Sequence, residues 1–251
     1  MLKYRKKQSN FFILRQFFMQ VNVSHAWNVS PAEAIQWQKK LSNSIRLLPV
    51  VNTQSIKRIA GVDVCYRNGY AIGGIVLFRY PELSIIDRQY LIQKITFPYI
   101  SGLLTFREGP VLTRLFQKIS RSPDVIIFDG QGIAHPRQMG IATHLGLFID
   151  CPTIGCAKSR LVGNFGEPDQ RKGHFSDLNY QGKTIGAVLR TKNNVKPVFI
   201  SPGNHINLQQ SIEIILNCIR QYRIPVPTRQ AHLFVNQIKV EFFPSQTRKA
   251  D

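Results

Sequence analysis

The stretch from Asp124 to Gly130, DVIIFDG, limits the possible folds more than any other part of the sequence. Its apolar core, VIIF, lacks the polar alternation of a strand that has one face in water. A short, continuously apolar run of this kind is typical of an interior strand of a parallel sheet, covered by helices on both faces. Asp129 ends the run, and Gly130, Gln131 and Gly132 follow it. This ending has two interpretations, a tight turn or a metal site beside a pocket.

The first half of the chain predicts one helix and an antiparallel meander. Residues 30–48 have apolar positions at helical spacing and begin with a Ser-Pro-Ala-Glu capping signal. Two apolar stretches then flank Asn68-Gly69, which is the strongest short signal for a β-hairpin. Residues 83–92 continue the pattern as a third strand.

The second half predicts alternating helices and strands. A meander followed by such units is typical of an α/β protein with a ribonuclease-H-like mixed sheet flanked by helices, in which the first strand lies beside the first parallel strand. The predicted helices cover 109–120 (with Pro110 at the start), 137–150 and 207–223, and the predicted strands cover 125–128, 151–157, 183–191 and 196–203.

The charge balance indicates a polyanionic partner. Lys and Arg number 33 against 14 acidic residues, which gives a formal net charge of +19. Such an excess costs self-repulsion, so it favours nucleic acid over a neutral partner, although a basic protein without such a partner is the plain alternative. The charge carries no information on catalysis, and no obligate protein partner is indicated.

The cysteines and the termini suggest a cytoplasmic protein of one main domain. The 4 cysteines form no C-x-x-C pair, so we expect reduced thiols rather than a disulfide framework. Residues 1–29 start basic and apolar, but Arg15 interrupts the apolar run, which is too short to span a bilayer. We therefore expect an N-terminal extension over 1–29, a catalytic domain over 30–240, a tail over 241–251, and no membrane partner.

Two aspartates meet if the predicted topology holds. Asp63 lies within the first strand and Asp129 ends the first parallel strand, so adjacent pairing places them side by side. Bare carboxylates at close range repel, and a hard divalent cation such as Mg²⁺ removes that conflict. Glu108, before the predicted helix start at Pro110, is a third candidate, favoured there by the helix dipole. Taken singly, Glu108 has an ordinary alternative as a helix-end charge, and Asp129 has one as a turn former. Asp63 is harder to explain in that way, because an acid inside an apolar strand is costly unless it is used or paired.

Several blocks in order resemble the endonuclease V family, whose members are deoxyinosine-specific endonucleases of nucleic-acid repair. They are GVDVCYRNG, FPYISGLLTFREGP, PDVIIFDGQGIAHPRQMGIATHLGL, CPTIGCAKSRLVG and a PTR near the C-terminus. The similarity runs from about Ser30 to about Ala231. It implies Mg²⁺-dependent cleavage of the second phosphodiester bond 3′ to deoxyinosine, leaving a 5′-phosphate and a 3′-hydroxyl, with Mn²⁺ expected to substitute.

The resemblance also implies roles for individual residues. Asp63 and Asp129 would ligate the metal with Glu108 as the third acid, and Lys158 would lie near the scissile phosphate, where the alternative is a solvated lysine. The implied wedge that enters the duplex at the lesion is Pro98, Tyr99, Ile100 and Ser101, with Tyr99 replacing the lost stacking. The implied pocket for the flipped base is Gly130, Gln131, Gly132 and His135, where glycines allow the backbone to approach the base edge. Without the resemblance, Tyr99 would be a core aromatic, and His135 a packing or capping residue.

One position departs from the family pattern. The family usually has a histidine directly after SPG, whereas here Asn204 holds that place and His205 follows. Either the loop presents His205 to the metal site, or Asn204 supports the site from a polar outer position. Two other functions therefore stay open: an inosine-specific ribonuclease, and a non-catalytic binder of damaged DNA if Asn204 disables the site.

Overall fold

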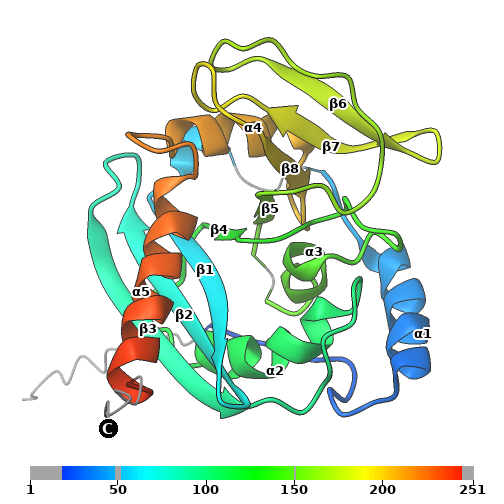
Figure 1. Ribbon diagram of the computed structural model, residues 1–251, viewed down its shortest axis with the longest axis vertical. Coiled ribbons are helices and arrows are strands. Elements are labelled where there is room, and N and C mark those ends of the chain that lie inside the picture. Colours follow the sequence, from blue (N-terminus) through cyan, green and yellow to red (C-terminus); the bar gives the residue numbers. More distant parts are fainter. Residues whose placement is uncertain (1–18, 49–51, 150, 245–251) are drawn as a thin grey trace, which may run out of the picture.

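The computed structural model describes residues 19–48, 52–149 and 151–244 (Figure 1). One mixed sheet of 8 strands runs in the order β3-β2-β1-β4-β5-β8-β7-β6. The strands are β1 (Arg58–Arg67), β2 (Tyr70–Arg79), β3 (Ile85–Lys94), β4 (Val125–Phe128), β5 (Thr153–Ala157), β6 (Phe175–Tyr180), β7 (Lys183–Leu189) and β8 (Val198–Pro202). The helices are α1 (Pro31–Leu41), α2 (Leu104–Phe116), α3 (Ile141–Gly146), α4 (Leu208–Asn217) and α5 (Val226–Phe242), with short 3₁₀ turns η1 (Ser42–Ser44) and η2 (Thr53–Ser55).

The predicted meander and the predicted strand neighbours are confirmed. β1, β2 and β3 pair antiparallel, and the hairpin turns at Asn68 and Gly69 with φ values of 49° and 77°, as a type I′ turn requires. β4 pairs parallel with β1 on one side and with β5 on the other. The sheet is therefore the mixed, ribonuclease-H-like arrangement that the sequence predicted, with helices on both faces (Figure 1).

Two cores lie on opposite faces of the sheet. One joins strand residues such as Ile127 and Ile200 to α4 and α5. The other joins the alternate residues, such as Ile126 and Phe128, to α2 and α3. β4 is buried throughout because consecutive residues enter different cores, which explains its unbroken apolar sequence. No helix in the described ranges is long and apolar enough to cross a membrane.

The predicted bounds of several helices were wrong. The first helix has its predicted capping box at Ser30, but it ends at Leu41, and Leu48 is 79% exposed. The second begins at Leu104, so Pro110 lies inside α2 rather than at its start. The reason is that the segment before Pro110 buries Phe106, and this gain in apolar burial outweighs the backbone hydrogen bond that proline removes.

Two elements were missed at the C-terminal side. β6 buries little more than Leu178, so it shows no strand alternation in the sequence. The last predicted helix, 207–223, ends as α4 at Asn217, and a further helix, α5, begins after Pro225. Pro225 and Pro227 hide this helix in the sequence, although Pro227 is tolerated in the first helical turn. α5 lies across β1 and β2 and carries a residue of the candidate site (Figure 1).

Residues 19–29 pack against α2 and α3. Met19 is 7% exposed, and the amide of Asn22 donates to the carbonyl of Phe148. The Trp27 ring covers Gly109 of α2 so closely that a β-carbon there would meet it at 2.3 Å. This segment is part of the packed structure, although the sequence resemblance began after it.

A buried histidine pair ties this segment to α3. The Nε2 atoms of His25 and His144 lie 2.7 Å apart, and Nδ1 of His25 lies 2.9 Å from the carbonyl oxygen of Ala26. Burial lowers the pKa of both rings from 6.5, and the charge of one ring opposes that of the other. Burial therefore favours the pair with both rings neutral. The rings around it are Trp27, Trp37, Phe106 and Phe148.

Acid is expected to destabilise the protein through this pair. Because the folded pKa values lie below 6.5, the unfolded chain takes up protons first, and stability falls as the pH drops below about 6.5. His144→Gln keeps an N–H donor for His25 and removes one titrating ring. Melting temperatures between pH 8 and about 5 should fall less in the variant than in the wild type. Parallel curves for the two proteins would contradict this prediction.

Candidate active site

Asp63, Asp129 and His232 come together where β4 ends beside the middle of β1. Val62 of β1 pairs with Phe128 of β4, and an aspartate directly follows each of these two residues. The amide of Asp129 donates to the carbonyl of Val62 at 3.2 Å. His232 comes from α5. One ligand atom from each of the three side chains lies within 4.8 Å of the others, which is the spacing of a metal site.

The surroundings of Asp63 suit a cation. Burial raises its pKa, the charge of Asp129 raises it further, and hydrogen bonding to His232 opposes both effects. The contact joins His232 Nδ1 to Asp63 Oδ2 at 2.8 Å, so the imidazole orients the carboxylate. Two carboxylates held together against their own repulsion, with an imidazole beside them, form a donor set that fits a divalent ion.

Glu108 lies close to this group, but in a different setting from the predicted one. It is inside α2 rather than before a helix start, so the expected stabilisation by the helix dipole does not apply. Burial raises its pKa to about 8, and the charges of Asp63 and Asp129 act in the same direction. The Tyr66 hydroxyl donates to Glu108 Oε1 at 2.5 Å and opposes this shift.

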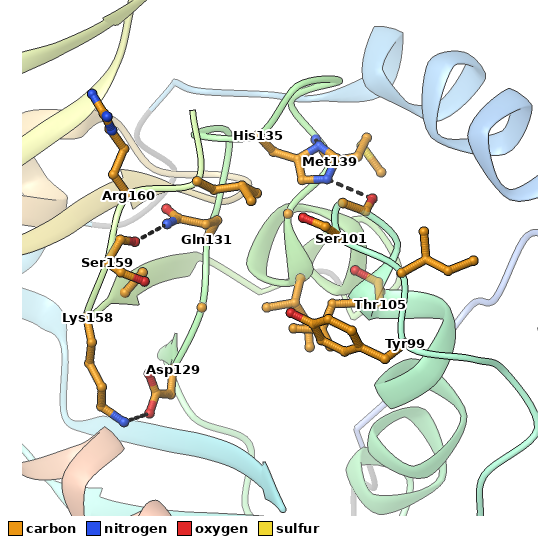
Figure 2. A pocket seen from close by; sticks show the side chains of 18 residues that line it. Tyr99, Ser101, Thr105, Asp129, Gln131, His135, Met139, Lys158, Ser159 and Arg160 are labelled. Carbon is orange, nitrogen blue, oxygen red and sulfur yellow. Dashed lines mark hydrogen bonds and ion pairs between the residues drawn. The ribbon is translucent and has the colours of Figure 1, made fainter. Parts of the chain in front are cut away.

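Lys158 lies at the edge of the acidic group, which consists of Asp63, Asp129 and His232. It follows β5, and its ammonium forms an ion pair with Asp129 (Figure 2). Its side chain is 42% exposed, whereas that of Asp129 is 13% exposed. A lysine that pairs with a site carboxylate and still faces solvent can exchange that partner for an incoming phosphate.

A pocket of about 310 Å³ opens next to the acidic group: Asp129 belongs to both, and Lys158, which pairs with Asp129, also lines the pocket. Figure 2 shows its walls: Lys158, Ser159 and Arg160 line one side, and Tyr99, Ser101 and Thr105 line the other. Of the residues predicted for a base pocket, Gly130, Gln131 and His135 line it. Of the predicted wedge, Tyr99, Ile100 and Ser101 line it, and Pro98 does not.

Gly132, which was also predicted for the pocket wall, is not among the residues that line this pocket. A β-carbon on Gly132 would lie 2.1 Å from the carbonyl oxygen of Pro202, at the end of β8. Its amide donates to Ser201 Oγ at 2.8 Å. The glycine is therefore required because the loop passes directly against β8, not because a ligand approaches it.

His135 fixes the loop that carries Tyr99. Its Nδ1 accepts from the amides of Arg137 and Met139 at 3.1 and 3.3 Å, so its Nε2 carries the proton and donates to the carbonyl of Gly102 at 2.9 Å. Burial lowers the pKa of His135 to about 4, which keeps the ring neutral. Arg137 and Gln38 donate to the same carbonyl.

Tyr99 projects from this anchored loop. It is 71% exposed, which excludes the core position that its sequence context alone suggested. Gly102 has a φ of +78° and lets the chain turn back into α2. A large exposed aromatic ring on a fixed loop at the rim of a pocket is suited to stacking against a ligand.

The structure does not bring His205 or Asn204 to Asp63 and Asp129. His205 lines a small hollow with Val125 and Pro152, at the opposite end of β4 from Asp129. Asn204 is buried and holds loops together: its Oδ1 accepts from the amide of Arg46, and its Nδ2 donates to the carbonyl of Gly146.

Sequence reasoning missed His232, the histidine that lies beside Asp63 and Asp129 in the structure. The available signal was the helical spacing of Ala231, Phe234, Val235 and Ile238, which bury one face of α5. His232 borders that face, directly after the first of these residues.

Comparisons with known proteins agree on one family. The family profile described as Endonuclease V matches residues 39–233. Endonuclease V of Methanothrix thermoacetophila is 48% identical over 215 residues, covering 86% of this chain and 95% of the relative. The crystal structure of Endonuclease V from Bacillus subtilis superposes with a TM-score of 0.85 at 34% identity, covering 89% of this chain and 98% of that one.

A further solved structure contains nucleic acid. It is Endonuclease V of Ciona intestinalis in complex with a 23mer DNA containing an inosine followed by a ribo-adenosine. It superposes with a TM-score of 0.75 at 26% identity, covering 85% of this chain and all of that one. Matches to both sequence and fold, over nearly the whole of each relative, show that this chain is a nuclease and belongs to the Endonuclease V family.

Proposed function

We propose that the protein is a Mg²⁺-dependent repair endonuclease that recognises deoxyinosine in DNA and cuts the second phosphodiester bond on its 3′ side. The observation that carries this proposal is the junction of the pocket and the acidic group, which share Asp129, while its ion-pair partner Lys158 lines the pocket beside it. One site can hold a base while the neighbouring site acts on a phosphate further along the same strand. The products would carry a 5′-phosphate and a 3′-hydroxyl.

In this proposal the pocket reads a base that has left the duplex. Hypoxanthine differs from adenine by a carbonyl oxygen at C6, so a backbone N–H of the pocket wall, such as that of Gln131, can favour it. The amide of Gly130 donates instead to the carbonyl of Phe128 at 2.9 Å. Tyr99 would occupy the space that the flipped base leaves in the stack. Flipping costs least at a mispaired base, so the pairing of the lesion adds to the selectivity.

The cleavage chemistry is assigned to the acidic group. Asp63, Asp129 and His232 would hold Mg²⁺ or Mn²⁺, with Glu108 close by. A bound divalent ion supplies Lewis acidity, which lowers the pKa of an attacking water and polarises a phosphate. Lys158 would leave Asp129 for a phosphate oxygen and stabilise the charge that builds on it. The excess of basic residues would track the DNA backbone.

Cleavage of a labelled duplex with one deoxyinosine tests the proposal. In Mg²⁺ we expect one nick, at the second bond 3′ to the lesion, and none in the same duplex with adenine at that position. Because a chain with a net charge of +19 would contact many phosphates, the affinity for the duplex should fall at least about 10-fold between 50 and 200 mM salt. Cleavage of both duplexes, or of neither, would contradict the proposal.

Inosine-containing RNA is the second candidate substrate. The specific reason is the Ciona relative, whose complex has a ribonucleotide directly after the inosine. Matched DNA, RNA and chimeric strands would rank the substrates by kcat/KM. A non-catalytic binder of damaged DNA was suggested by the lack of a histidine at position 204. It is the weaker candidate, because His232 lies beside the two aspartates and would supply an imidazole there, while Asn204 holds loops together.

Tyr99→Ala is expected to impair cleavage of duplex more than of single strands. The ring stabilises an opened duplex, and stacking of one base on an aromatic ring contributes about 1–3 kcal/mol, so kcat/KM for duplex should fall by about 10- to 100-fold. In a single strand there is no partner strand to separate, so the loss should be several-fold smaller. Comparing both substrates measures the difference, and equal losses would rule out a wedge.

A further inference from the structure

Tyr66 connects the acidic group to α2. It lies on β1, on the side of the strand that faces α2, whereas Asp63 bonds to α5 on the other side. Its hydroxyl donates to Glu108 Oε1 at 2.5 Å. This is a charge-assisted contact when Glu108 is ionised, and such contacts are short and directional.

The Tyr66 ring is also held from the other side. The guanidinium of Arg107 lies 4.7 Å from the ring centre. The same guanidinium donates to the carbonyl of Phe97 at 2.7 Å. Phe97 directly precedes Pro98 and Tyr99, so one set of contacts runs from the base of the Tyr99 loop through Arg107 and Tyr66 to Glu108.

The carboxylate of Glu108 needs a hydrogen-bond partner to keep its position. It is buried, and the charges of Asp63 and Asp129 repel it from the group that it is expected to serve. Among the hydrogen bonds found for the described residues, the one from Tyr66 is the side-chain contact made to its carboxylate. It occupies Oε1 and leaves Oε2 for a water molecule or an ion.

We propose that Tyr66 is a positioning residue for the nuclease reaction: its hydroxyl holds Glu108 in place for the metal-bound state, while Arg107 links the same ring to the Tyr99 loop. The inference rests on the proposed function, since Glu108 matters only if the acidic group binds a divalent ion. The alternative is a tether that merely fastens α2 to β1. A tether would affect stability and leave metal binding unchanged.

The test uses Tyr66→Phe, which keeps the ring under Arg107 and removes only the hydroxyl. Tyr70→Phe is the matched control, because Tyr70 lies on the same hairpin and is exposed. Three quantities are measured for each protein: Mn²⁺ affinity by calorimetry, the single-turnover cleavage rate on deoxyinosine duplex, and DNA affinity without metal. The same set is repeated in a Glu108→Gln background.

We expect Tyr66→Phe to weaken Mn²⁺ binding and slow the single-turnover step by about 10-fold each, as is usual when a partner of a metal-site carboxylate is lost. DNA affinity should stay within about twofold, and Tyr70→Phe should match the wild type. In the Glu108→Gln background the Tyr66 substitution should add no further loss, because the hydroxyl acts through that carboxylate.

Unchanged Mn²⁺ affinity in Tyr66→Phe would overturn the inference, as would an equal loss in both backgrounds. The proposed function fails separately, if the wild type binds Mn²⁺ but leaves the deoxyinosine duplex uncut. In that case the calorimetric comparison still decides whether Tyr66 positions Glu108.

Discussion

Asp129→Asn is expected to abolish cleavage while DNA binding persists. Asp129 belongs to the acidic group, pairs with Lys158 and borders the pocket, so no other single side chain joins as many parts of the described site. An amide of the same size keeps the shape and removes the charge that a divalent ion needs. Losing about 4 kcal/mol of transition-state stabilisation would slow cleavage by about a thousandfold or more.

Thermal stability provides a second measurement that does not depend on activity. An ion that binds only the folded state raises the melting temperature, so Mn²⁺ should stabilise the wild type and have little effect on Asp129→Asn. Without metal, the variant should melt no lower than the wild type, because burial and Asp129 together raise the pKa of Asp63. Removing one of the two charges relieves that repulsion.

Asp124→Asn is the matched control. Asp124 precedes β4 as Asp129 follows it, and its Oδ2 accepts from the amides of Lys57 and Arg58 at 2.8 Å. An asparagine oxygen can accept the same bonds, so cleavage should stay within several-fold of the wild type. If Asp124→Asn were as inactive as Asp129→Asn, the loss would reflect damage to β4 rather than to a metal site.

The meeting of Asp63 and Asp129 could be predicted because it depends on local patterns and one topological rule. The Asn68-Gly69 turn fixes the first hairpin, and the apolar run before Asp129 fixes an interior strand. Once β4 lies parallel to β1, the register follows from which residues can be buried. Few alternative registers remain, so the sequence correctly places Asp63 beside Asp129 although the two residues are far apart in the chain.

Other parts of the site depend on packing that local patterns do not record. His232 reaches Asp63 only because α5 crosses β1, and nothing near His232 in the sequence specifies that crossing. Glu108 looked like a helix-end acid because Pro110 follows it, but the buried Phe106 extends the helix toward its N-terminus. His205 was predicted from its neighbours in the chain, and it lies at the end of β4 opposite to Asp129.

Gly132→Ala is expected to be the most destabilising of these substitutions, although the loop looked like ligand-facing backbone in the sequence. The new β-carbon would lie 2.1 Å from the carbonyl oxygen of Pro202 and 2.7 Å from that of Ser201. Both neighbours are backbone of β8, so neither can rotate away. The loop must move instead, which breaks the bond from the Ile133 amide to Pro202 at 2.8 Å.

We expect a loss of about 3 kcal/mol or more in the free energy of unfolding, measured by denaturant titration, and a collapsed pocket in whatever remains folded. Gly166→Ala is the control, because a β-carbon at Gly166 meets nothing within 4 Å and its φ is not positive. That substitution should be neutral or slightly stabilising, since it only restricts the unfolded chain. If Gly132→Ala were instead stable but unable to select deoxyinosine, the glycine would serve the base, and close packing against β8 would not be the reason for it.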